Sequence, residues 1–156
     1  MKSNNTQQRQ IDIDRIVETV TLWTGITTEG GRFGSTSFQL AGTEIGHLHS
    51  RLADIDYPSA LRDQLIASGR TAEHHAVPKH PTATTLRLDS ADDVDHAIWL
   101  FRLSYIVHVV ILQKTGETNT EFREISSHKE IADLTSDTAI RSAFEAAIVD
   151  SDKIWN

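Results

Sequence analysis

The hydrophobic residues of this chain recur at two different spacings, and each spacing predicts one kind of element. Spacings of three and four residues predict helices that bury one face. Such helices are predicted over residues 13–24, from Pro58 to Gly69, from Ser90 through the apolar run 97–112 and, more weakly, around residues 127–130 and 140–148. The longest helix has a capping-box-like start, because Asp93 follows Ser90 by three residues.

Segments that alternate or are rich in β-branched residues predict three strands, over residues 35–40, 43–49 and 82–88. The letters "AGT" join the first two and predict a hairpin. The glycine-rich segment 28–34 is interpreted as a connection. The predicted order is α-β-β-α-β-α plus a helical C-terminal tail. This order favours an α+β fold, with an antiparallel three- to four-stranded sheet and helices on one face.

These elements divide the chain into four parts. Residues 1–10 are polar and predict a flexible N-terminus, and residues 11–113 form the predicted α+β domain. Residues 114–124 are interpreted as a linker, and residues 125–156 as a C-terminal helical extension packing on the domain. This extension ends near Trp155, an aromatic residue suited to docking.

The apolar run 97–112 needs to be tested as a membrane span. It is shorter than the roughly 20 residues that cross a bilayer, and it contains Arg102 and His108. We therefore predict a buried core helix, with Trp99 and Leu103 inside the protein. An arginine in so apolar a segment needs a carboxylate partner, so Arg102 is expected in a structural ion pair.

The composition narrows the classes of function. Among the 156 residues, 15 are lysine or arginine and 22 are acidic, and the net charge of -7 argues against nucleic-acid binding. The absence of cysteine excludes disulfides, thiolate nucleophiles and thiolate metal sites. Because residues 1–10 lack the apolar segment of a signal peptide, we expect a cytoplasmic protein without a membrane partner.

Four histidines in two short segments are the main candidates for chemistry. In "EIGHLH", side chains two residues apart point to the same face of a strand, which predicts that Ile45, His47 and His49 lie together. The opposite face carries Leu48. If helices cover that face, the two histidines stand on the open face of the sheet, where a ligand has access.

The second pair, His74 and His75, follows in the loop "AEHHAVP", and we expect at least one of them to reach the same site. Two imidazoles spaced like His47 and His49 can hold a first-row metal when a third ligand arrives from elsewhere. The metal set that we favour is His47, His49 and His74.

Two aspartates in "DIDYP" allow two interpretations. Asp54 or Asp56 could supply the third metal ligand, or both could satisfy free amides at the start of the helix that Pro58 opens. For a ligand site without metal, we expect the four histidines to be joined by Asp56 and Arg62 at the rim.

The succession "FQLAGTEIGHLHS", "DIDYP", "LRDQLIASGR", "AEHHAVP" and "DDVDHAIWLFRLSY" resembles the small luciferase-like domain family of bacteria, archaea and eukaryotes. The label of this family comes from a sponge protein, and the family is not similar to firefly or flavin-dependent luciferases. The resemblance covers about residues 33–105 and implies the fold rather than an activity. Members usually carry a Gly-Trp pair where this chain has Pro81 and Thr82. More distantly, the order of elements resembles the MmcQ/YjbR double-wing domains.

Together these observations predict a small-molecule-binding domain with a histidine-lined site on the open face of the sheet. The first alternative is an enzyme that uses the same residues, either with a divalent transition metal as cofactor or with a histidine as general base. The second alternative is a protein-interaction module or homodimer without a ligand.

Overall fold

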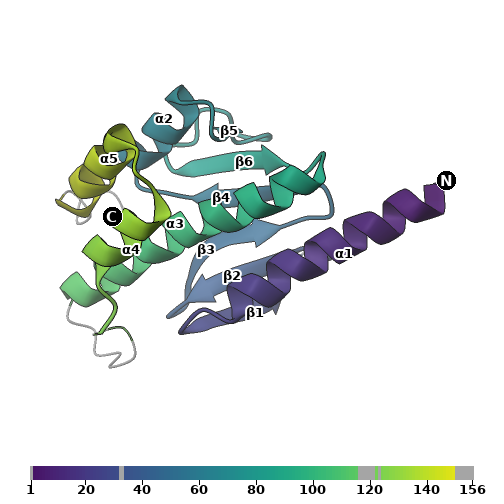
Figure 1. The fold of residues 1–156 in the computed structure, drawn as a ribbon, viewed down its shortest axis with the longest axis horizontal. Coiled ribbons are helices and arrows are strands. Elements are labelled where there is room, and N and C mark those ends of the chain that lie inside the picture. Colours follow the sequence, from purple (N-terminus) through teal and green to yellow (C-terminus); the bar gives the residue numbers. More distant parts are fainter. Residues whose placement is uncertain (1, 32–33, 116–121, 123, 150–156) are drawn as a thin grey trace.

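The computed structural model describes residues 2–31, 34–115, 122 and 124–149 (Figure 1). The elements are α1 (Lys2–Thr21), β1 (Ile26–Gly30), β2 (Thr36–Leu40), β3 (Thr43–Leu48), β4 (Leu52–Asp56), α2 (Ser59–Ala67), β5 (Ala72–Glu73), β6 (Ala83–Arg87), α3 (Ala91–Thr115), α4 (Ser127–Leu134) and α5 (Thr138–Val149). The strands form one antiparallel sheet in the order β1-β2-β3-β4-β6-β5.

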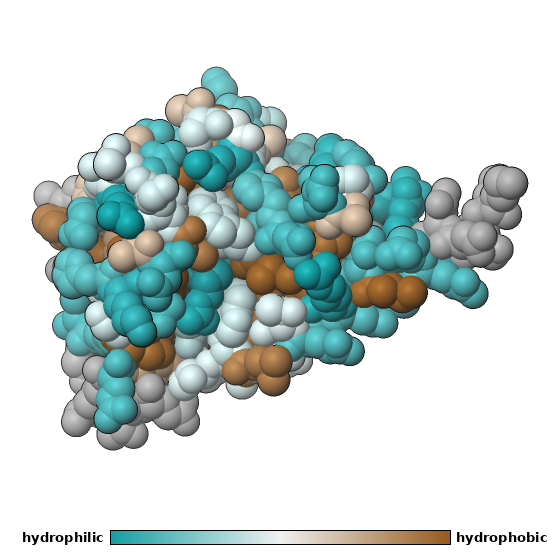
Figure 2. Space-filling view, viewed as in Figure 1, coloured by the Kyte–Doolittle hydropathy of each residue, from teal (hydrophilic) through white to brown (hydrophobic). Residues whose placement is uncertain are grey.

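The helices cover one face of this sheet, so the predicted α+β class is confirmed. Figure 1 shows α3 lying across the strands, with α1 beside it, and α3 contacts β2, β3, β4 and β6. The helices α2 and α5 pack together near β5. The outer surface of this helical layer is mostly hydrophilic, with apolar side chains in separate patches (Figure 2). The other face of the sheet therefore remains available for a site.

The sheet has six strands rather than the three or four predicted. The strand β1 falls partly in segment 28–34, which we interpreted as a connection. Only Ile26 in β1 is partly buried, so this strand lacks an apolar alternation. The strand β4 falls where we expected the approach to a helix, and β5 comprises two residues. The strands β1 and β5 form through pairing with neighbours, which local patterns do not report.

The predicted hairpin joins β2 to β3. Ala41 and Gly42 both have positive φ, 51° and 84°, as in the tight turns that match strand twist. The pairing then shifts, because Phe38 faces Gly46 while Gln39 faces Glu44, which leaves Ile45 as an extra residue. The prediction that Ile45 lies on the same face as the histidines is therefore wrong. At the bulge the side chain of Ile45 points into the core, where it is fully buried.

The long helix α3 forms the centre of the core. Leu103 is fully buried as predicted, whereas Trp99 is half-buried and donates its Nε1 hydrogen to the Leu134 carbonyl at 2.9 Å. Within the described residues, this helix is the one whose length and composition could span a membrane, and 67% of its most apolar window is buried inside the protein. That burial fits the predicted core helix. At its start, Asp93 accepts hydrogen bonds from the backbone N–H groups of Asp89 and Ser90.

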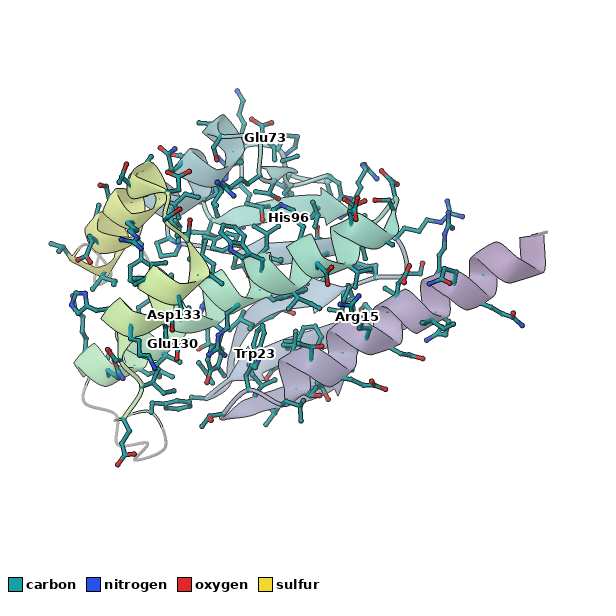
Figure 3. The ribbon with its side chains drawn as sticks, viewed as in Figure 1. Arg15, Trp23, Glu73, His96, Glu130 and Asp133 are labelled. Atoms are coloured by element: carbon teal, nitrogen blue, oxygen red, sulfur yellow. The ribbon has the colours of Figure 1, made fainter. Side chains whose placement is uncertain are left out.

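The predicted ion pair of Arg102 is present. Its guanidinium lies 2.9 Å from Glu130 on α4 and stacks on Trp23, whose ring centroid is 5.0 Å away. Trp23 and Glu130 are labelled in Figure 3. Arg102 therefore ties the C-terminal helices to the end of α1, as expected for a structural rather than a substrate-binding arginine.

The ends of the chain differ in detail from the expectation. Helix α1 begins at Lys2 and so includes most of the segment for which we expected flexibility. Both tail helices are present, but the side chain that caps α4 is Ser126, whose hydroxyl accepts from the Lys129 N–H. Trp155 and most of the predicted linker, residues 116–121 and 123, lie outside the described residues.

Candidate functional site

A buried aspartate lies at the centre of the open face of the sheet. In β4, Ala53 and Ile55 point into the core, which places Asp54 on the opposite face. Asp54 is nevertheless only 3% exposed. It pairs with His47 on β3 and with Thr85 on β6, so three strands bring polar side chains to one point. The Thr85 hydroxyl donates to Asp54 Oδ1 at 2.5 Å.

The other carboxylate oxygen of Asp54 is surrounded by the four predicted histidines. Their Nε2 atoms lie 3.0 Å (His47), 3.2 Å (His75), 3.6 Å (His74) and 3.7 Å (His49) from Asp54 Oδ2. His47 and His49 therefore share the open face, as strand alternation predicts. Both histidines of the "AEHHAVP" loop lie near the same oxygen, where at least one of them was expected.

Backbone and side-chain hydrogen bonds hold the second histidine pair over the sheet. Strand β5 pairs Ala72 with Thr85, and the His75 N–H then donates to the Thr85 hydroxyl at 3.0 Å. Arg62 of α2 donates to the Pro78 carbonyl at 2.9 Å and to the Ala83 carbonyl at 3.4 Å. Arg62 was predicted at the rim of a ligand site, and in the structure its guanidinium holds the loop that carries the histidines.

Charge in the cluster is concentrated on His47 and the carboxylates beside it. Hydrogen bonds to Asp54 and Glu44 raise the pKa of His47 to about 10. Burial would raise the pKa of Asp54, but hydrogen bonds from His47 and Thr85 outweigh burial and lower the pKa to about 2. The bond to His47 also lowers the pKa of Glu44, which accepts a second hydrogen bond from Ser37 at 2.6 Å. At neutral pH the cluster thus contains one imidazolium–carboxylate pair.

The pKa values of three other groups in the cluster are shifted in the direction that favours the uncharged form. Burial lowers the pKa of His49, and the charge of His47 lowers it further. Burial also lowers the pKa of His74. Asp56 lies on the same face of β4, where burial and the charge of Glu44 raise its pKa to about 6. Neutral imidazoles have a lone pair available for a metal ion.

Two sets of atoms in the cluster have the spacing that a metal ion requires. His47, His49 and Asp54 offer ligand atoms that all lie within 4.8 Å of one another, and so do Asp54, His74 and His75. Asp54 belongs to both sets. Imidazole and carboxylate ligands suit zinc, iron, nickel and copper.

A hollow of about 510 Å³ adjoins the cluster at the β5 edge of the sheet. His75 and Thr85 border it on the side of the cluster, and Arg70 and Arg87 contribute positive charge. Glu73 and His96, which Figure 3 labels on β5 and α3, also line it, as do Asp89 and Asp93. Its volume is in the range of small-molecule sites.

Sequence reasoning missed three residues at this site. Asp54 was one of two candidate aspartates, and the predicted rim named Asp56 instead. Strand alternation predicted Glu44 on the face opposite the histidines, which is wrong, because the bulge at Ile45 brings Glu44 to within 3.4 Å of His47. Thr85 was not considered. A signal for Asp54 was present, because "LADIDY" alternates apolar and acidic residues as a half-buried strand does.

The fold and the cluster define a small α+β domain whose histidines and aspartate are compatible with a ligand- or metal-binding site. Residues 42–104 match the model of the Luciferase domain family, which confirms the resemblance to small luciferase-like domains over this segment. The matched segment includes Asp54 and all four histidines of the cluster. Searches of the curated proteins and of the solved structures found no match.

Proposed function

We propose that this domain binds a divalent first-row transition ion in the histidine–aspartate cluster. The observation that carries the proposal is that four imidazole Nε2 atoms surround one buried carboxylate oxygen at 3.0 to 3.7 Å. Two ligand atoms that are each about 2.0–2.2 Å from one ion, at angles of about 90–120°, are about 2.8–3.8 Å apart. The cluster thus has nearly the spacing of a coordination sphere.

The chemistry of the residues fits such an ion. Asp54 supplies a negative charge that water does not screen, and a neutral His49 supplies a nitrogen lone pair. A bound ion with an open position lowers the pKa of a coordinated water and polarises a bound carbonyl or phosphoryl oxygen. The protein's own contribution is to hold the ligands in place, through Thr85 on Asp54 and Glu44 on His47.

A second candidate function is the binding of a small molecule without metal. The hollow of about 510 Å³ beside His75 and Thr85 supports it. In this case the four histidines would donate to or accept from the ligand, Asp56 would lie beside them, and Arg62 would act by holding the loop. The two candidates share residues but differ in whether an ion is required.

Metal analysis of the full chain separates these candidates. The protein should be purified without a polyhistidine tag, its metal content measured by mass spectrometry, and its melting temperature recorded before and after chelation. We expect stoichiometric zinc, iron, nickel or copper, and a lower melting temperature for the chelated protein, because an ion bound to the folded state stabilises it by mass action.

Two variants sharpen this test. Asp54→Asn removes the charge shared by both sets of ligand atoms and should abolish stoichiometric metal binding. His128→Gln is the matched control, since the His128 side chain on α4 is 85% exposed and its replacement should leave metal content unchanged. A wild-type protein that is free of metal, and whose melting temperature does not respond to added zinc, cobalt, nickel or copper, would rule the metal site out.

A further inference from the structure

We infer that a single ion is ligated by His47, His49 and Asp54, and that His74 is not a ligand. The ion keeps coordination positions open on the side of the cluster where His75 lies, and these positions take an exchangeable water molecule or a small anion. This inference rests on the metal-binding function proposed above. It follows from which ring nitrogen carries the proton in His74 and in His47, and from the spacing of the ligand atoms.

His74 uses its lone pair inside its own loop. Its Nδ1 accepts hydrogen bonds from the backbone N–H groups of Ala76 at 3.2 Å and Val77 at 3.0 Å. A nitrogen that accepts hydrogen bonds is not protonated, so the proton of the neutral ring is on Nε2. The Nε2–H group lies 3.6 Å from Asp54 Oδ2, so on this side the ring presents a hydrogen and not a lone pair to the cluster. Metal ligation by His74 would require breaking both backbone bonds or removing a second proton from the ring.

His80, in the same loop, also accepts backbone hydrogen bonds at its Nδ1 atom. The Nδ1 atom of His80 accepts from the backbone N–H groups of Thr82 at 3.2 Å and Ala83 at 3.1 Å. The loop between β5 and β6 therefore uses two imidazoles to satisfy its own amides. In this loop the His74 imidazole therefore positions the backbone rather than an ion.

In His47 the Nδ1 atom faces a hydrogen-bond acceptor, whereas in His74 it faces donors. Its Nδ1 lies 3.4 Å from Glu44 Oε1, and an ionised carboxylate can only accept a hydrogen. Ser37 donates to the same Glu44 oxygen and holds it in place. A neutral His47 thus carries its proton on Nδ1 and presents the Nε2 lone pair to the cluster. This carboxylate–histidine arrangement is the one that orients metal ligands.

The remaining ligands follow from spacing. The ligand atoms of His47, His49 and Asp54 are mutually within 4.8 Å, so one ion can contact all three after small adjustments. In the other set, which shares Asp54, His74 does not offer a lone pair. Three protein ligands leave one position free on a tetrahedral ion and three on an octahedral ion. Such open positions are a property of sites that bind exogenous ligands.

Cobalt(II) titration of the chelated full-length protein tests the inference, because the visible bands of cobalt report its ligands and coordination number. Asparagine is the matched replacement, since its side-chain amide can replace Nδ1 as an acceptor at His74 and as a donor at His47, while Nε2 is removed. The variants are His74→Asn, His47→Asn and His49→Asn, with azide as the exogenous ligand and circular dichroism as the check on folding.

We expect one equivalent of cobalt in the wild type and a shift of its bands on addition of azide. His74→Asn should keep the stoichiometry and the band positions, and lose no more than the roughly 10–100-fold in affinity that outer-shell partners contribute. His47→Asn and His49→Asn should change the bands and lose more than this. If His74→Asn does not fold, His74→Gln takes its place with the same expectation.

Three results would overturn the inference while leaving the metal-binding function intact. They are two equivalents of cobalt per chain, bands altered by His74→Asn as strongly as by His47→Asn, and bands that do not respond to azide. Failure of the folded wild type to bind cobalt or any other ion would instead overturn the proposed function itself.

Discussion

Replacing Gly46 with alanine tests whether the close approach of β3 and β4 sets the geometry of the cluster. A Cβ atom on Gly46 would lie 2.8 Å from the backbone oxygen of Asp54 and 2.8 Å from the Phe101 ring, whereas ordinary contact begins at 3.4 Å. The Asp54 oxygen belongs to the neighbouring strand and cannot rotate away. Because His47 pairs with Asp54 in the same register, separation of these strands would also move the His47 imidazole away from the carboxylate.

The expected cost follows from this overpacking. Inserting a methyl group into a well-packed site costs about 1–3 kcal/mol, and we expect the upper part of this range because Phe101 is fully buried and one clash is with backbone. The free energy of unfolding should be measured by urea denaturation of the metal-free protein, which isolates the packing effect. Cobalt affinity, measured separately, should fall for Gly46→Ala because the ligand set is displaced.

Gly30→Ala in β1 is the matched control. A Cβ atom there meets nothing within 4 Å, so its free energy of unfolding should stay within about 0.5 kcal/mol of the wild type and its cobalt affinity should be unchanged. The reasoning is refuted if Gly46→Ala also stays within about 0.5 kcal/mol and retains full cobalt affinity.

Three further predictions concern the core and the support of Asp54. Leu103→Ala should cost about 2–5 kcal/mol in urea denaturation, and a cost below about 1 kcal/mol would contradict the central position of α3. Thr85→Val removes a hydrogen bond to a charged carboxylate and should cost about 1.5–3 kcal/mol, so unchanged stability would contradict its role. Burial lowers the pKa of His108 from 6.5 to about 4. The unfolded chain therefore binds the extra proton between these pH values, and the contribution of His108 to stability falls with decreasing pH by about 3 kcal/mol. Unfolding of His108→Leu at about pH 7 and about pH 4.5 should lack this contribution, and an unchanged pH dependence would contradict it.

Periodicity predicted the parts of the fold that depend on local sequence. The long helix, the β2–β3 hairpin and the helical tail all have patterns that a short window reveals. The same reasoning predicted that His47 and His49 share one face, because alternation along a strand is local. It could not predict the bulge at Ile45, which arises from the pairing of β3 with β2.

The choice between Asp54 and Asp56 depends on information that local sequence does not carry. Both residues share the open face of β4, so alternation treats them alike. Asp54 is central because the sheet register places it between His47 and Thr85. The role inferred for His74 likewise depends on which imidazole nitrogen meets the backbone amides of a turn. Both distinctions require three-dimensional contacts.

The number of histidines around Asp54 supports a role beyond the stability of the fold. A buried carboxylate must be compensated, and the His47 imidazolium and the Thr85 hydroxyl already do so. His49 brings another imidazole nitrogen to the same oxygen, and its lowered pKa means that it adds no positive charge near neutral pH. A divalent ion would replace the proton on His47 and use the lone pair of His49, so that the charge on Asp54 and the neutral imidazole beside it serve the same ligand.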